Sequence, residues 1–193
     1  MGDSGIKTKT AVLSVASNSL LILLKVIAGI LSGSVSIISE AIHSAMDLLA
    51  AIIAFFSVKI SAKPADRDHP YGHGKVENIS GVIEGLLILA AAVIIIWEAI
   101  KKIINPTEIG ETNIALLVMF ISAAVNFFVS KRLYKVAKET DSVALEADAL
   151  HLKTDVYTSL GVGVSMGLIK FTGISILDPI VAILVALLIL KEA

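Results

Sequence analysis

The sequence predicts an all-α membrane protein with six transmembrane helices, and three observations support this fold class. Of its 193 residues, 56% are hydrophobic and only 17% are charged, whereas a soluble domain carries roughly 25% charged residues. The apolar residues gather into six long segments, and the basic residues favour the connections on one side. We therefore expect the chain to be embedded in a lipid bilayer.

Each apolar segment is interpreted as one bilayer span. Most segments reach the ~20 residues that a helix needs to cross the hydrocarbon core. The fifth is the most interrupted by polar residues, and the last is the shortest. The predicted spans cover residues 11–31, 35–58, 79–100, 113–133, 143–169 and 174–190.

The basic residues predict the orientation of these spans, because cytoplasmic loops are rich in Lys and Arg. One face collects Lys7, Lys9, Lys59, Lys63, Arg67, Lys75, Lys131, Arg132, Lys135, Lys138 and Lys191, and the other has Lys101, Lys102 and Lys170. Both termini are therefore predicted to be cytoplasmic. The net charge of −1 indicates no large basic surface for nucleic acid. Because the chain has no cysteine, the ligands of any bound metal would be His, Asp and Glu.

An internal repeat relates the two halves of the chain. A shift of 108 residues superposes four pairs of polar residues: His43 on His151, Asp47 on Asp155, Glu40 on Asp148 and Asn18 on Asn126. Because each half has an odd number of spans, the halves must face opposite ways across the membrane. An inverted 3+3 repeat of this kind is typical of secondary transporters.

The pattern acid-Ala-aliphatic-His-x-x-x-Asp occurs in the second and the fifth span. Charged groups near the bilayer centre cost about 2.5 to 3.5 kcal/mol each, so intramembrane carboxylates favour a functional interpretation. Each His and its Asp are four residues apart and share a helical face. Counted from the outer edge at ~1.5 Å per residue, the depths are about 12 Å (His43), 15 Å (Asp155), 18 Å (Asp47) and 21 Å (His151). The sequence predicts one four-ligand site near mid-membrane.

Two imidazoles and two carboxylates suit tetrahedral Zn²⁺. Cd²⁺, Co²⁺ and Fe²⁺ are competitors, and an all-oxygen site would favour Mn²⁺. Because an imidazole must lose its proton to bind a metal, protons and metal compete for such a site. The alternative is that each His/Asp pair is a hydrogen bond within one helix. Supporting roles near the ligands are predicted for Asn18, Glu40 and Asp148.

The loop of residues 64–75 holds the remaining histidines. Asp66 or Asp68, together with His69 and His73, could form a second and more exposed metal site. The alternative is a solvated loop whose Pro and Gly residues shape its turns.

Three motifs together resemble the cation diffusion facilitator family over essentially the whole chain: Ser39-Glu40-Ala41-x-His43-x-x-x-Asp47, Asp68-His69-Pro70-Tyr71-Gly72-His73-Gly74-Lys75 and Ala147-Asp148-x-Leu150-His151-x-x-x-Asp155. The resemblance implies a six-helix transmembrane domain, usually a homodimer, that exports divalent transition metals from the cytoplasm in exchange for protons. It implies a mid-membrane site at His43, Asp47, His151 and Asp155, and a loop site at Asp66, His69 and His73. Having His at position 43 resembles the zinc-preferring branch.

The chain departs from the family pattern because family members commonly continue into a cytoplasmic metal-sensing domain that helps them to dimerise. We therefore expect a weakened homodimer. The leading hypothesis is a Zn²⁺/H⁺ antiporter of a prokaryotic cytoplasmic membrane that works by alternating access, with the metal as substrate and no organic cofactor. A membrane metalloenzyme is disfavoured because no His-Glu-x-x-His motif occurs and Glu40 is the only plausible general base. A scaffold with a structural metal is the third alternative.

Overall fold

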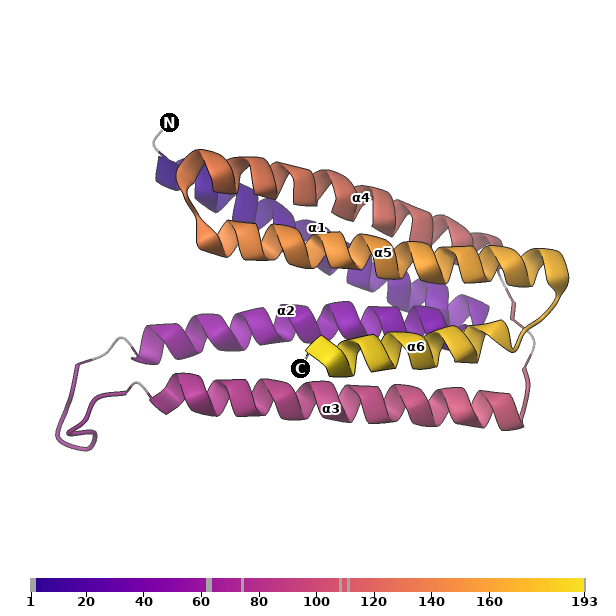
Figure 1. Cartoon of the computed structure of the whole chain (residues 1–193), viewed down its shortest axis with the longest axis horizontal. Helices are drawn as coiled ribbons and strands as arrows, with labels where there is room; N and C mark the ends of the chain where they lie inside the picture. Colours follow the sequence, from indigo (N-terminus) through magenta and orange to yellow (C-terminus); the bar gives the residue numbers. More distant parts are fainter. Residues whose placement is uncertain (1–2, 62–63, 74, 108, 111, 193) are drawn as a thin grey trace.

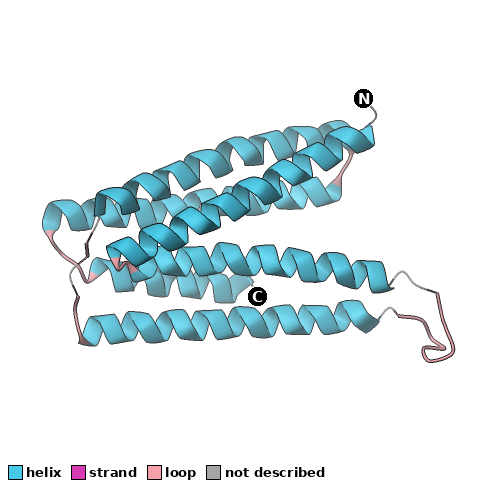
Figure 2. Ribbon diagram, turned by 180° about the vertical axis from the view of Figure 1, so that it is seen from behind, coloured by secondary structure: helices cyan, strands magenta, loops and turns pink. Residues whose placement is uncertain are grey.

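Six α-helices and the connections between them make up the part of the chain that the computed structural model describes, which is residues 3–61, 64–73, 75–107, 109–110 and 112–192. Lys63 lies outside these ranges. Helices and loops account for all of the described residues (Figure 2). The all-α prediction is confirmed.

The helices follow the predicted segments and extend beyond most of them. They are α1 (Asp3–Ser32), α2 (Val35–Ser61), α3 (Lys75–Ile104), α4 (Thr112–Thr140), α5 (Val143–Thr172) and α6 (Leu177–Glu192). By length and composition, Lys9–Ser32, Asn78–Ile104 and Thr112–Thr140 are apolar enough to cross a membrane. These segments lie in α1, α3 and α4.

The last helix begins three residues later than its predicted span. Gly173 has φ 71°, a left-handed conformation that ends α5, and its amide donates to the carbonyl of Ile169. Turns then occupy the next residues, and Leu177 opens α6 two residues before Pro179, which the first turn of a helix accepts. The predicted span starts earlier than the helix because apolar character continues through this turn.

The connections alternate between the two ends of the bundle (Figure 1). The N-terminus, the loop around residues 64–73 and the α4–α5 connection share one end, which we call the N-terminal end. The α1–α2, α3–α4 and α5–α6 connections lie at the opposite end. Helices α4 and α5 pack along each other most extensively, whereas α2 meets α5 only over a short stretch.

The hydrophobic core differs between these ends. A large cluster includes Ala28, Ile37, Ile95, Met119, Met166 and Ala186, so that all six helices contribute to it. A second cluster towards the N-terminal end contains Leu133 and Leu152 and draws its buried members from α4 and α5, with partly buried residues of α1 beside them. The bundle is therefore held together by all its helices at the opposite end, and by α1, α4 and α5 at the N-terminal end.

Asp178 of α6 anchors the first turn of α2. Its carboxylate accepts hydrogen bonds from the backbone amides of Val35 (2.8 Å) and Ser36 (3.1 Å). The same carboxylate pairs with Lys102 of α3 at 3.0 Å, and all of Asp178 is buried. Because a helix start leaves amides without intrahelical partners, this one carboxylate joins α2, α3 and α6.

Candidate metal site

The structure brings together the four residues predicted to form the intramembrane site, two from α2 and two from α5. His43 Nε2 lies 3.9 Å from Asp155 Oδ1, and His151 Nε2 lies 3.2 Å from Asp47 Oδ2. Within α2, His43 Nδ1 is 3.4 Å from Asp47 Oδ2. The imidazole centroids of the two histidines are 6.3 Å apart. His43, Asp47 and Asp155 each offer a ligand atom within 4.8 Å of the other two.

Burial increases across the site from the N-terminal end to the opposite end. The side chains of His151 and Asp47 keep 35% and 18% of their surface exposed, whereas those of His43 and Asp155 keep 4% and 0%. Both carboxylate oxygens of Asp155 are buried without a hydrogen-bond donor among the described residues. Because buried polar groups normally find partners, these oxygens and the facing imidazoles suit a bound cation.

A pocket of about 450 Å³ reaches the more exposed half of the site. Its walls come from the N-terminal half of α1, the middle of α2 and the first turns of α5, and include Asn18, Asp47, Asp148 and His151. These segments lie towards the N-terminal end of the bundle (Figure 1). A solute entering from that end would meet Asp47 and His151 first.

Two of the three residues with predicted supporting roles, Asn18 and Asp148, line this pocket. The Oδ1 atom of Asn18 is buried without a hydrogen-bond donor among the described residues. Asp148 lines the pocket together with Ser14 of α1. Both residues therefore lie on the approach to the ligands.

Glu40 occupies a different environment, on the far side of the ligands from the pocket. Its Oε1 atom accepts hydrogen bonds from Lys25 Nζ (3.2 Å), Thr158 Oγ1 (3.0 Å) and Ser159 Oγ (2.6 Å). Lys25 also donates to Ser44 Oγ at 3.0 Å. Residues of α1, α2 and α5 thus form a closed polar layer between the site and the opposite end.

Sequence reasoning did not assign Lys25 to the site. Its side chain is fully buried in the ion pair with Glu40, and its charge acts on the Asp155 carboxylate. The available signal was a lysine in the middle of an apolar span, since a buried lysine requires an anionic partner. Lys102 lies just beyond the predicted third span, so the same signal did not point to its pairing with Asp178.

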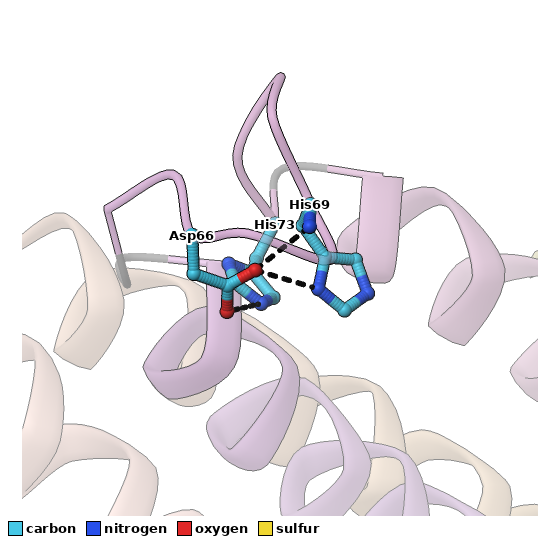
Figure 3. Close-up of side chains that lie close together, drawn as sticks. All are labelled: Asp66, His69 and His73. Carbon is cyan, nitrogen blue, oxygen red and sulfur yellow. Dashed lines mark hydrogen bonds and ion pairs between the residues drawn. The ribbon is translucent and has the colours of Figure 1, made fainter.

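The loop residues Asp66, His69 and His73 also form a compact group (Figure 3). Asp66 Oδ1 lies 3.1 Å from His69 Nδ1, and Asp66 Oδ2 lies 3.4 Å from His73 Nε2. The two imidazole centroids are 4.3 Å apart. Of the two acids predicted for the loop site, Asp66 belongs to this group and Asp68 does not.

Local hydrogen bonds hold Asp66 in position. The backbone amide of His69 donates to Asp66 Oδ1 at 2.7 Å, and this bond lowers the pKa of the Asp66 carboxyl below its usual range. Gly72, at φ 79°, makes the tight turn between the two histidines. The carboxylate is therefore ionised at any pH at which an imidazole can bind a metal.

Comparison with known proteins identifies the family to which the chain belongs. A sequence profile of the cation efflux transmembrane domain matches residues 11–193. The chain belongs to the cation efflux family. This cation efflux chain is 37% identical over 173 residues to an uncharacterised transporter of Synechocystis sp., covering 90% of this chain and 56% of the relative. It is 38% identical over 185 residues to an uncharacterised transporter of Methanocaldococcus jannaschii, covering 96% of this chain and 65% of the relative.

A relative whose name states its substrates is less similar to this cation efflux chain. The cadmium, cobalt and zinc/H⁺-K⁺ antiporter of Bacillus velezensis is 28% identical over 170 residues, which cover 88% of this chain and 54% of that protein. The chain thus spans little more than half to about two thirds of the length of these relatives. Family membership and the apolar helices establish a multi-pass membrane protein.

Proposed function

We propose that this chain forms the transport path of a divalent metal exporter that exchanges Zn²⁺ for protons. The supporting observation is the convergence of His43, Asp47 and Asp155 around buried carboxylate oxygens that have no hydrogen-bond donor among the described residues. His151, 3.2 Å from Asp47, supplies the fourth ligand. Two imidazoles and two carboxylates favour Zn²⁺ over Cd²⁺, Co²⁺ and Fe²⁺, and Mn²⁺ is least suited.

Proton exchange follows from the chemistry of the ligands. The two carboxylates balance the divalent charge of the ion, and each imidazole binds it only when deprotonated. A proton arriving from the outer side therefore competes with the metal at the same atoms. The Bacillus relative, named as a cadmium, cobalt and zinc/H⁺-K⁺ antiporter, supports an exchange that involves protons.

The same proposal includes six membrane spans in an inverted repeat, with both termini in the cytoplasm. The N-terminal end of the bundle then faces the cytoplasm and carries the pocket, while the layer of Glu40, Lys25 and Ser159 closes the outer side. This arrangement corresponds to an inward-facing state of an alternating-access carrier. The metal enters through the pocket, and the polar layer must open to release it outside.

The loop group of Asp66, His69 and His73 is proposed as a second metal site, located where the metal approaches the membrane. Isothermal titration of the purified chain with Zn²⁺ should then show one site fewer in the variant Asp66→Asn/His69→Ala. An unchanged number of bound ions would exclude the loop site. The variant leaves the intramembrane ligands untouched, so the two sites are tested separately.

Zn²⁺ uptake into inverted membrane vesicles with an acidified interior tests the main proposal. We expect His43→Ala and Asp155→Asn to lower uptake more than tenfold, since even loss of a residue that supports a metal ligand costs about 10- to 100-fold. Asp141→Asn, an exposed acid in the α4–α5 connection, is the matched control and should transport normally. Transport that is unaltered in Asp155→Asn would refute the assigned site.

The competing functions lose support in the structure. Glu40, the candidate general base of a metalloenzyme, is ion-paired with Lys25, and its Oε1 atom also accepts from Thr158 and Ser159. A structural metal would be enclosed, whereas here a pocket leads to two of the four ligands. Rapid exchange of bound Zn²⁺ for Cd²⁺ in the purified chain would distinguish a carrier from a scaffold.

A further inference from the structure

A groove on the outer surface of the α4–α5 pair lies on the faces that point away from the candidate metal site. It has a volume of about 590 Å³, which is within the range of sites that hold small molecules. Phe127, Tyr134 and Tyr157 contribute exposed aromatic surface to it. Large exposed apolar side chains are expected where a protein contacts acyl chains.

The groove also carries a concentrated positive charge. Lys131, Lys135 and Lys153 line it, and no carboxylate does so among the described residues. Lys131 Nζ lies 4.2 Å from the centroid of the Phe127 ring. Lys135 has a loose, exposed ion pair with Glu139 at 3.8 Å, and no ion pair within the described chain involves Lys153. The groove therefore offers ammonium groups to an anion from outside the protein.

The depth of these lysines follows from how the two helices are aligned. Ser130 Oγ donates to the carbonyl of Ala149 at 2.6 Å, so these two residues lie at the same level. Lys131 is then close to the cytoplasmic edge of the predicted span, and Lys153 lies about 6 Å deeper, one helical turn beyond Ala149. A lysine at that depth directs its ammonium towards the interface, where the phosphates of the lipid are.

We propose that this groove binds an anionic phospholipid of the cytoplasmic leaflet. The phosphate would lie among the three lysines, and an acyl chain would follow the apolar part of the groove past Tyr157. Basic pockets between helices on the cytoplasmic side are suited to such headgroups. The proposal goes beyond metal transport, and it depends on the orientation proposed above only for the choice of leaflet.

The charge of the groove disfavours a symmetric dimer whose twofold axis passes through the groove. A twofold interface places the same patch on both subunits. Lysines would then face lysines, and like charges opposed across an interface are unfavourable. An anionic lipid satisfies the lysines and the apolar surface together.

Native mass spectrometry of the full chain tests the proposal, with phosphatidylglycerol and phosphatidylcholine of the same acyl composition in competition. We expect the wild type to retain phosphatidylglycerol preferentially and Lys131→Gln/Lys153→Gln to bind it about twentyfold more weakly, since each lysine near a membrane surface contributes about fivefold. Lys75→Gln/Lys191→Gln, which removes equal charge at the same end outside the groove, should retain the preference. Free glycerol phosphate at the same concentration should not displace the lipid.

Three results would overturn the proposal: no headgroup preference in the wild type, an unchanged preference in Lys131→Gln/Lys153→Gln, or an equal loss in the control pair. Displacement by glycerol phosphate would identify a phosphate site in place of a lipid site. The single variants Lys131→Gln and Lys153→Gln should each lose part of the preference for phosphatidylglycerol. They provide the test if the double variant does not fold. Zn²⁺ titration of the same samples reports separately on the metal site.

Discussion

Lys25 and Glu40 form a fully buried ion pair one helical turn from the candidate ligands His43 and Asp155. Its hydrogen bonds to Ser44 and Ser159 satisfy part of the polar surface that burial removes from water. Breaking such a pair by removing one partner is costly because the other charge remains buried and uncompensated. The pair thus links the stability of the bundle to the surroundings of the metal site.

We predict that Lys25→Met destabilises the folded chain by about 3–5 kcal/mol. Lys25→Met/Glu40→Gln should recover most of this loss, since the remaining amide can still accept from Ser159. Lys101→Met, which breaks an exposed 3.7 Å pair with Glu98, is the matched control and should cost about 1 kcal/mol or less. The midpoint of unfolding in sodium dodecyl sulfate ranks the stabilities of these variants. Equal midpoints for Lys25→Met and Lys101→Met would contradict the prediction.

The helices themselves were predictable, and so was the arrangement of the ligands within each of them. Apolar runs located the six segments, and the spacing of four residues put each His on the same helical face as its Asp. The contact of His151 with Asp47 of the other helix is not given by that spacing. The partners of Lys25 and Lys102 were not predictable, because they lie 15 and 76 residues away in sequence and nothing in helical periodicity selects them. The start of α6 at Leu177 was not predictable, because hydropathy does not register a turn inside an apolar run.

At the scale of the elements, Asp178 is the connection between α2, α3 and α6. We predict that Asp178→Ala leaves the amides of Val35 and Ser36 uncapped and Lys102 without its anion, at a cost of about 3–5 kcal/mol for the lost pair. Hydrogen exchange at the first turn of α2 should become at least about fivefold faster, given ~1 kcal/mol for the cap alone. Asp178→Asn, which keeps an acceptor, should have a smaller effect.

Glu98→Gln on α3 is the control for this prediction, because its carboxylate lies on the exposed surface at the same end. Exchange at the first turn of α2 should be unchanged in that variant. Equal exchange in Asp178→Ala and the wild type would show that the carboxylate does not hold α2.

At the scale of the whole molecule, the described structure is open at one end and closed at the other. The pocket reaches Asp47 and His151 from the N-terminal end. On the other side of the ligands, Glu40 ties α2 to Thr158 and Ser159 of α5. The large cluster to which all six helices contribute reinforces that closed side.

Single cysteines test this asymmetry, because the chain has none of its own. We predict that a membrane-impermeant maleimide labels Ala50→Cys in the pocket only from the cytoplasmic side. Thr107→Cys, in the exposed α3–α4 connection, should be labelled only from the outside, and the buried Ala41→Cys from neither side. Labelling of Ala50→Cys from the outside would reverse the proposed orientation.

The short contact between α2 and α5 has a mechanical consequence. α5 is fastened along α4, and α2 is fastened to α3 and α6, yet the two ligand-bearing helices share little packing of their own. A cation held by both would add a direct connection between these two helices, beside the hydrogen bonds of Glu40. The metal-bound protein would then be more rigid than the metal-free protein. The transported ion would itself restrain the relative movement of α2 and α5.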